Sequence, residues 1–180
     1  MPRIQPVDPQ TATGAAADHL ATTRKMFGST PNMFATAAQA PVALEALNAF
    51  FATLAKASLG AKVGEQIAIA VAQANGCGYC LSAHTAIGKM HGVAAADLEG
   101  ARRGQASDRK VAALLTLATA INQSRGHVDD ATLAAARSAG VIDAEIVEVI
   151  AHVALNVFTN TLNNVSETEI DFPVVTAKAA

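Results

Sequence analysis

Apolar residues recur along this sequence at the three- and four-residue spacing of α-helices. Residues 67–72, which read Ile-Ala-Ile-Ala-Val-Ala, are apolar on every side and predict a buried helix. A broad apolar stripe on one side of the helix expected over 41–57 is formed by Val42, Leu44, Leu47, Phe50, Phe51 and Leu54. No segment alternates convincingly between apolar and polar residues as a strand would, so we expect an all-α fold.

Prolines, glycines and capping residues divide the chain into a series of expected helices. The first should begin after Thr11 or Thr13 and end near Gly28. Asp108, Asp129 or Asp130, and Asp143 are the expected N-caps of the last three helices. After the last helix, Asp171-Phe172-Pro173 should lead into a strand-like or irregular tail. The remaining helices are expected at 32–38, 41–57, 61–75, 77–91, 95–103, 108–125, 130–138 and 143–165.

Length and composition limit the kind of protein this can be. With 180 residues, of which 51% are apolar, the chain suits a single domain over 1–180, preceded by an extended proline-containing arm at 1–10. Its 13 basic and 15 acidic side chains form no block of like charge, so neither nucleic acid nor a membrane surface is an expected partner. No apolar run approaches the roughly 20 residues of a membrane span, and the N-terminus has no signal segment. We therefore expect a soluble cytoplasmic protein.

The only two cysteines lie in the segment Cys77-Gly78-Tyr79-Cys80, at the expected start of the helix 77–91. At about 100° per residue, Cys77, Cys80, His84 and His91 fall on one face of that helix. Free N–H groups and the macrodipole at a helix N-terminus stabilise a thiolate. A CxxC in this position favours reversible dithiol and disulfide chemistry. His84 lies one turn from Cys80 and is the natural acceptor of a thiol proton.

Glu65 is expected near the start of the preceding helix, where the helix dipole favours a glutamate whether or not it has a function. The tight Asn75-Gly76 turn permits the two helices to pack as an antiparallel hairpin. Glu65 would then lie about 16 Å from the turn, at 1.5 Å per residue, beside His84. In this arrangement Glu65 could exchange protons with His84 directly or through a water.

Other interpretations of the cysteine helix stay open at this point. An inert buried pair is one, and a zinc site is another, although only three ligands are clustered in sequence and zinc normally takes four. His91 lies about 10 Å beyond His84 and is interpreted as a second-shell or structural residue. Tyr79 points off the shared face and could simply pack, but like His91 it is counted among the residues expected to surround the reacting groups.

The last helix carries a polar stripe on an otherwise apolar surface. This stripe could form a hydrogen-bonded seam between helices or subunits, or it could line the thiol pocket. Its members are His152, Asn156, Asn160 and Asn163.

Glu65, an eleven-residue gap and then Cys77-x-x-Cys80-x-x-x-His84 resemble the signature of the AhpD-like alkylhydroperoxidases within the carboxymuconolactone decarboxylase superfamily. The resemblance is firmest over 41–93, and Glu-Ile-Asp-Phe-Pro at 169–173 resembles the closing segment of peroxidase-related members. It implies an AhpD-like helical bundle with the CxxC at the N-terminus of a central helix. It also implies a homo-oligomer, a trimer or hexamer, with the site near a subunit interface and with neither cofactor nor metal.

By the same resemblance, Cys80 attacks a hydroperoxide substrate, Cys77 resolves the sulfenic acid into a disulfide, and His84 and Glu65 relay protons. An external dithiol or protein reductant then reduces the disulfide. Tyr79 stands where the best known members have a histidine, and a phenol is a poor proton acceptor at pH 7. The alternatives are a non-catalytic redox-sensing or stress-response module, a zinc-binding structural module and, ranked well below peroxide reduction, a carboxymuconolactone-type decarboxylase.

Overall fold

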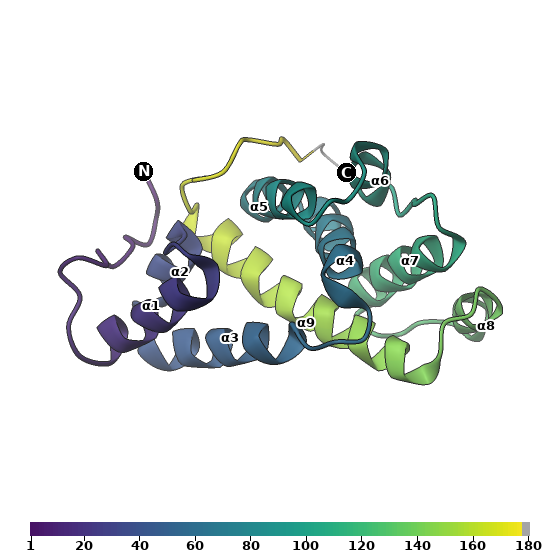
Figure 1. Ribbon diagram of the computed structural model, residues 1–180, viewed down its shortest axis with the longest axis horizontal. Coiled ribbons are helices and arrows are strands. Elements are labelled where there is room, and N and C mark those ends of the chain that lie inside the picture. Colours follow the sequence, from purple (N-terminus) through teal and green to yellow (C-terminus); the bar gives the residue numbers. More distant parts are fainter. Residues whose placement is uncertain (178–180) are drawn as a thin grey trace.

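The computed structural model describes residues 1–177, which are helical with no strand, so the expected all-α fold is confirmed (Figure 1). None of the helices in this part of the chain combines the length and apolar character needed to cross a bilayer. The helices are α1 (Gly14–Phe27), α2 (Asn32–Ala37), α3 (Pro41–Leu54), α4 (Gly60–Ala74), α5 (Gly78–Met90), α6 (Ala95–Ala101), α7 (Arg109–Ser124), α8 (Asp130–Ser138) and α9 (Asp143–Ser166).

The helix ends follow local signals that are visible in the sequence. Gly28 ends α1 in the left-handed conformation, at φ 75°, as glycine does at helix C-termini. Asp108 and Asp129 cap α7 and α8 through their side chains, as predicted. The prediction for α9 was wrong by one residue, because Asp143 is the first helical residue and its carboxylate pairs with Arg137 at 2.9 Å.

Helix α9 runs through the middle of the molecule and contacts α2, α3, α4, α5 and α7 (Figure 1). Helix α4 lies against α5, α7 and α9, and its segment 67–72 is buried as predicted. Ile67, Ile69 and Val71 are fully excluded from solvent. This interior fixes α4, α5 and α9 relative to one another, and these three helices carry the candidate site.

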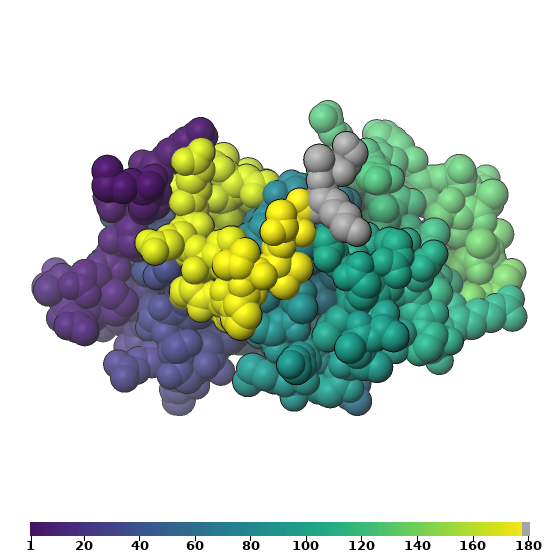
Figure 2. Space-filling model, turned by 90° about the horizontal axis from the view of Figure 1, so that it is seen from above, coloured from purple at the N-terminus to yellow at the C-terminus, as the bar shows by residue number. Residues whose placement is uncertain are grey.

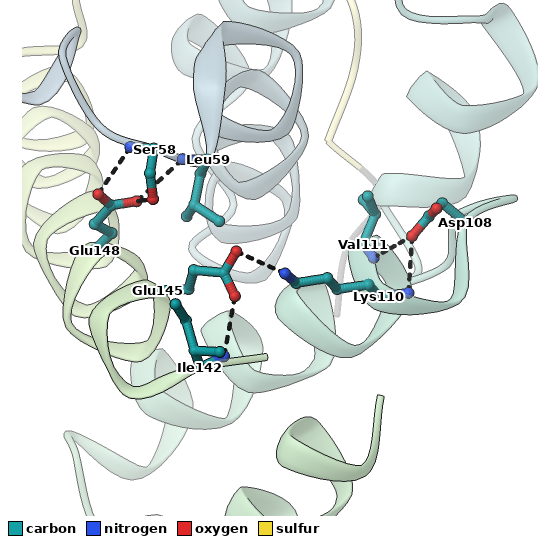
Figure 3. Close-up of polar contacts among 8 residues, drawn as sticks. All are labelled: Ser58, Leu59, Asp108, Lys110, Val111, Ile142, Glu145 and Glu148. Carbon is teal, nitrogen blue, oxygen red and sulfur yellow. Dashed lines mark hydrogen bonds and ion pairs between the residues drawn. The ribbon is translucent and has the colours of Figure 1, made fainter. Parts of the chain in front are cut away.

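Two glutamates attach the first turns of α9 to neighbouring segments (Figure 3). Glu145 accepts hydrogen bonds from Lys110 Nζ at 2.7 Å and from the Ile142 N–H at 3.0 Å. Glu148 accepts hydrogen bonds from the backbone N–H groups of Ser58 and Leu59, at 2.8 and 3.1 Å. The carboxylates thus tie α9 to α7 and to the loop before α4.

Both terminal segments pack on this chain itself. In the N-terminal arm, the Arg3 N–H donates to the Ser166 carbonyl at 2.7 Å and the Val7 N–H donates to the Ala35 carbonyl at 2.9 Å. The C-terminal segment, yellow in Figure 2, crosses the surface between the N-terminal helices and the region of α5 and α6. It is irregular, and the Val175 N–H donates to Ser82 Oγ of α5 at 2.9 Å.

Candidate active site

The cysteine pair lies at the turn between α4 and α5, which form the expected antiparallel hairpin. Gly76 occupies the left-handed region at φ 63°, and the Cys77 N–H donates to the Ala72 carbonyl at 2.9 Å. Cys77 is the N-cap of α5, with its Sγ accepting the Cys80 N–H at 3.4 Å. Both cysteines are buried and reduced. The chain therefore places the two thiols together at the start of a helix, as the spacing predicted.

Glu65 of α4 and His84 of α5 meet across this hairpin. Glu65 Oε2 lies 2.8 Å from His84 Nδ1, and the side chains are only 17% and 15% exposed. Gly88 of α5 permits the close approach of α6, because a Cβ there would come within 2.8 Å of the Leu98 side chain. The predicted proximity of these two residues is confirmed.

The two cysteines differ in pKa because their electrostatic surroundings differ. A hydrogen bond from the Cys77 thiol is the largest factor that lowers the pKa of Cys80, from 9.0 to about 6. Burial opposes this decrease, while the positive charge of His84 and the amides of Asn163 and Asn160 support it. The same hydrogen bond, with burial, raises the pKa of Cys77 far above its ordinary value. Cys80 is thus the thiolate at neutral pH and Cys77 the thiol.

The environment of His84 keeps it protonated more readily than a free imidazole. Burial alone lowers its pKa, but the charge of Glu65, the hydrogen bond to Glu65 and the Cys80 thiolate together raise it. An imidazolium next to a thiolate can both stabilise that thiolate and donate a proton to a leaving group.

Two residues of α9 complete the surroundings of Cys80. Asn163 Nδ2 donates to Cys80 Sγ at 3.2 Å, and the Cys80 thiol donates to Thr159 Oγ1 at 3.9 Å. Asn163 belongs to the polar stripe of α9, and a lining of the thiol pocket was one of the two interpretations of that stripe. Thr159 lies outside that stripe, and sequence reasoning missed it. Both interpretations apply to Asn160, whose Oδ1 accepts a hydrogen bond from Asn75 Nδ2 at 3.0 Å and whose amide helps to lower the pKa of Cys80.

A small cavity of about 60 Å³ opens beside Cys80 and His84. Its walls are almost wholly apolar. Phe27 and Phe34 lie 4.9 Å apart between ring centroids, and Phe172 of the C-terminal segment packs edge-on against Tyr79 at 5.8 Å. The lining residues are Phe27, Pro31, Met33, Phe34, Phe51, Tyr79, Cys80, Ala83, His84, Ile87, Thr159 and Phe172.

Tyr79 lines the cavity next to Cys80 and also makes hydrogen bonds. Its hydroxyl donates to Asp171 Oδ1 at 2.7 Å and accepts the Met33 N–H at 3.2 Å. The second oxygen of Asp171 accepts the Asn32 N–H at 2.9 Å. Burial, with a contribution from Asp171, raises the pKa of Tyr79 well above its ordinary value, so the phenol stays protonated. These hydrogen bonds join the C-terminal segment to α5 and α2 beside the cavity, and we call the pair of Tyr79 and Asp171 the clasp.

The other two histidines considered in the sequence lie elsewhere. His91 is the exposed C-cap of α5, seven residues beyond His84. His152 of α9 packs against Gly64, where an added Cβ would come within 2.8 Å of its ring, and burial lowers its pKa. Its buried Nε2 has no hydrogen-bond partner in the described structure. Within residues 1–177, no three His, Cys, Asp or Glu side chains gather as ligands of a metal ion would.

Comparison with known proteins gives a family match over part of the chain and a fold for nearly all of it. Residues 41–116 match the sequence model of the carboxymuconolactone decarboxylase family. No curated protein matches the sequence significantly. Among solved structures, the fold is similar to that of a peroxidase-related protein with an AhpD core from Ralstonia eutropha JMP134. The TM-score is 0.81 at 23% identity, over 94% of this chain and 92% of that chain.

Two further structures have the same fold. A peroxidase-related protein from Silicibacter sp. TM1040 matches with a TM-score of 0.74 at 20% identity, over 92% of this chain and 91% of that chain. A variant of the debrominase Bmp8 in complex with 2,3,4-tribromopyrrole matches with a TM-score of 0.78 at 22% identity, over 93% and 91%. Residues 41–116 are thus similar to the carboxymuconolactone decarboxylase family, and the chain as a whole has the fold of these AhpD-like structures.

Proposed function

We propose that this protein is a thiol-dependent peroxidase that reduces organic hydroperoxides through a Cys77–Cys80 dithiol and disulfide cycle. The observation that carries the proposal is the thiolate of Cys80, with its pKa lowered to about 6, facing an apolar cavity beside a second thiol. The resemblance of Glu65, Cys77, Cys80 and His84 to the AhpD signature supports the same chemistry. A reducing compartment such as the cytoplasm would supply the electrons.

In the first step, the Cys80 thiolate attacks the terminal oxygen of the hydroperoxide and the O–O bond breaks. The hydroxyl stays on sulfur as a sulfenic acid, and the alkoxide leaves with a proton from His84 to form the alcohol. In the second step, Cys77 attacks the Cys80 sulfur, a disulfide forms, and the hydroxyl leaves with the Cys77 proton as water. An external dithiol or protein reductant returns two electrons and two protons to the disulfide.

The hydrogen bond of 2.8 Å between Glu65 and His84 suits this cycle. Glu65 fixes the imidazole in place and favours its protonated form before the peroxide arrives. The cavity lining offers aromatic and aliphatic surface and no lysine or arginine, so an uncharged organic hydroperoxide fits it better than an anionic one.

Reductive dehalogenation of a small aromatic ring is a second candidate function, favoured by the aromatic cavity against the Cys80 thiolate. A debrominase of the same fold was crystallised with a brominated pyrrole. In such a reaction the dithiol loses two electrons and two protons to become the disulfide. The carbon–bromine bond becomes carbon–hydrogen, and bromide and one proton are released.

We also propose that the exposed apolar face of α9 contacts a second copy of this chain in a homo-oligomer. Exposed positions along this face recur at spacings of three and seven residues, with one adjacent pair, as in a helix that packs against a partner helix. Changing Val157 and Phe158 together to glutamate should reduce the assembly size measured by light scattering, and an unchanged size would refute this interface. The exposed apolar residues of the face are Val147, Ile150, Val157, Phe158 and Val165.

The function is tested by measuring consumption of cumene hydroperoxide by the reduced protein with excess dithiothreitol. A peroxidase turns over many equivalents per subunit at a rate far above that of dithiothreitol alone, whereas a redox-sensing module consumes one equivalent in its oxidation and then adds little to the rate of dithiothreitol alone. A Cys77→Ser variant should accumulate sulfenic acid that a dimedone probe labels at Cys80. Absence of turnover and of label would refute the proposal, and bromide release from a bromopyrrole in place of peroxide turnover would support dehalogenation.

A further inference from the structure

Buried amide groups on α9 lie next to the reacting sulfur with part of their hydrogen-bonding capacity unused. Asn160 is 1% exposed and Asn163 is 3% exposed. Neither Asn160 Nδ2 nor Asn163 Oδ1 has a hydrogen-bond partner in the described structure, and both atoms are buried. Buried polar atoms are normally paired, so an unpaired donor and an unpaired acceptor in one site indicate a role that requires a further group.

The side chain of Asn163 is hydrogen-bonded to the sulfur of Cys80. Its Nδ2 donates to Cys80 Sγ at 3.2 Å, which is within range for a hydrogen bond to sulfur. This bond joins positions 83 residues apart in the chain, and it is the one hydrogen bond that the described structure gives this side chain. The hydrogen bond through which the Asn163 side chain ties α9 to another helix thus ends on the sulfur of Cys80.

A network of amides fixes the orientation of Asn160. Asn75 Nδ2 donates to Asn160 Oδ1 at 3.0 Å, and Asn122 Nδ2 donates to Asn75 Oδ1 at 2.8 Å. With its oxygen held by Asn75, Asn160 must direct its N–H groups elsewhere. Residues three apart share a face of a helix, so Asn160 and Asn163 lie side by side. The amide of Asn160 also contributes to the low pKa of Cys80.

The hydroxyl of Thr159 has a different role. Its proton is donated to the Asn156 carbonyl at 3.2 Å, which leaves Oγ1 to accept the Cys80 thiol at 3.9 Å. It therefore favours the thiol form of Cys80, whereas the neutral amides of Asn160 and Asn163 favour the thiolate. A carboxamide donor does not titrate near neutral pH, so it can stabilise an anion throughout the working range.

We propose that Asn163 and Asn160 are catalytic residues whose side-chain N–H groups form an anion hole for the Cys80 thiolate and for the oxygen that Cys80 takes up. This inference rests on the peroxidase cycle proposed above. A sulfenic acid hydroxyl is both a donor and an acceptor, which matches the free acceptor Asn163 Oδ1 and the free donor Asn160 Nδ2. Preorganised donors of this kind stabilise charge that develops in a transition state.

The test compares Asn163→Leu and Asn160→Leu with the matched control Asn156→Leu. Asn156 is buried on the same helix, but its amide donates to the His152 carbonyl at 2.8 Å and does not contact the sulfur. The readout is the rate of iodoacetamide alkylation of the reduced protein as a function of pH, assigned to Cys80 by peptide mass. The same variants are assayed for the rate of sulfenic acid formation with cumene hydroperoxide.

Asn163→Leu should raise the alkylation midpoint from about 6 and lower the alkylation rate at pH 6 about tenfold, since charged hydrogen bonds contribute at this scale. Sulfenic acid formation should fall about tenfold even at pH 8.5, because the hole also acts on the transition state. Asn160→Leu should move both quantities in the same direction, and Asn156→Leu should leave the midpoint unchanged. A midpoint in Asn163→Leu equal to that of wild type and control would overturn the inference.

A measurement on the wild type decides the matter if the variants do not fold. The Asn163 and Asn160 side-chain amide resonances should shift with pH at the midpoint of Cys80 alkylation, and amide resonances that do not follow that titration overturn the inference. Alkylation needs no peroxide, so failure of the two ideas can be told apart. If the alkylation midpoint rises in the Asn163 and Asn160 variants but the protein does not turn over peroxide, the peroxidase function is rejected and the thiolate site is kept. If the protein turns over peroxide but the midpoint does not change in these variants, only the anion hole is rejected.

Discussion

Replacing Cys77 tests the electrostatic asymmetry of the thiol pair. The Cys77 thiol donates a hydrogen bond to the Cys80 thiolate, and this is the largest factor that lowers the pKa of Cys80 to about 6. Cys77→Ala removes the donor, whereas Cys77→Ser keeps a hydroxyl donor at nearly the same place. The two variants lack the same resolving thiol, so their difference isolates the hydrogen bond.

The size of the effect follows from the energy of a hydrogen bond to a charged group. Such a bond contributes about 1.5 to 3 kcal/mol, which is about one to two pKa units at 1.36 kcal/mol each. In Cys77→Ala the midpoint of Cys80 should rise by that amount from its value of about 6. At pH 6.5 the thiolate fraction would fall from about three quarters to between about a quarter and a thirtieth.

Stopped alkylation with iodoacetamide between pH 5 and 9, assigned to Cys80 by peptide mass, measures this midpoint. Cys77→Ser should titrate close to the wild type, and Cys77→Ala should titrate clearly above it. If all three proteins share one midpoint near 6, the hydrogen bond is not what lowers the pKa, and the reasoning fails. Equal increases in both variants would instead assign the effect to the sulfur itself.

Three other changes have defined outcomes. Glu65→Gln should lower the rate of peroxide reduction at pH 7 about 10- to 100-fold, because His84 loses the carboxylate that raises its pKa; an unchanged rate contradicts the relay. Gly64→Ala would bring a Cβ within 2.8 Å of the His152 ring and should reduce the free energy of unfolding by about 1 to 3 kcal/mol in urea titrations, whereas greater stability would show that the ring moves easily. Because the Cys80 pKa falls from 9.0 to about 6 on folding, its contribution to stability is present above pH 9 and lost as the pH falls through 6. The unfolding free energy of the reduced wild type, relative to Cys80→Ser, should therefore rise between pH 6 and 8, and a flat difference contradicts the shift.

Much of the fold could be predicted because its signals are local. Caps such as Asp108 and glycines such as Gly28 fixed helix ends, and the uniform apolar run at 67–72 identified a buried helix. The pairing of Glu65 with His84 was also predictable, because a short turn between two helices of predicted length sets their register. The cap of α9 was misplaced because an aspartate in the first turn of a helix has the same local signal as one at the cap.

The parts of the site that the sequence did not reveal come from distant segments. Thr159 lies 79 residues from Cys80, and Asp171 lies 92 residues from Tyr79, so no spacing rule connects them. Their positions depend on how α9 and the C-terminal segment pack against α5, which is a property of tertiary structure. The cavity walls have the same origin, since Phe27, Phe34 and Phe172 belong to three separate segments.

The clasp between Tyr79 and Asp171 has a practical consequence for following the chemistry. The chain has one tyrosine and no tryptophan, so excitation at wavelengths longer than phenylalanine absorbs gives emission from a single ring, adjacent in sequence to Cys80. That phenol donates a 2.7 Å hydrogen bond to a carboxylate, and such bonding quenches tyrosine emission. If this hydrogen bond breaks, the intensity of tyrosine fluorescence should increase, so the fluorescence of an unlabelled sample reports on movement of the C-terminal segment.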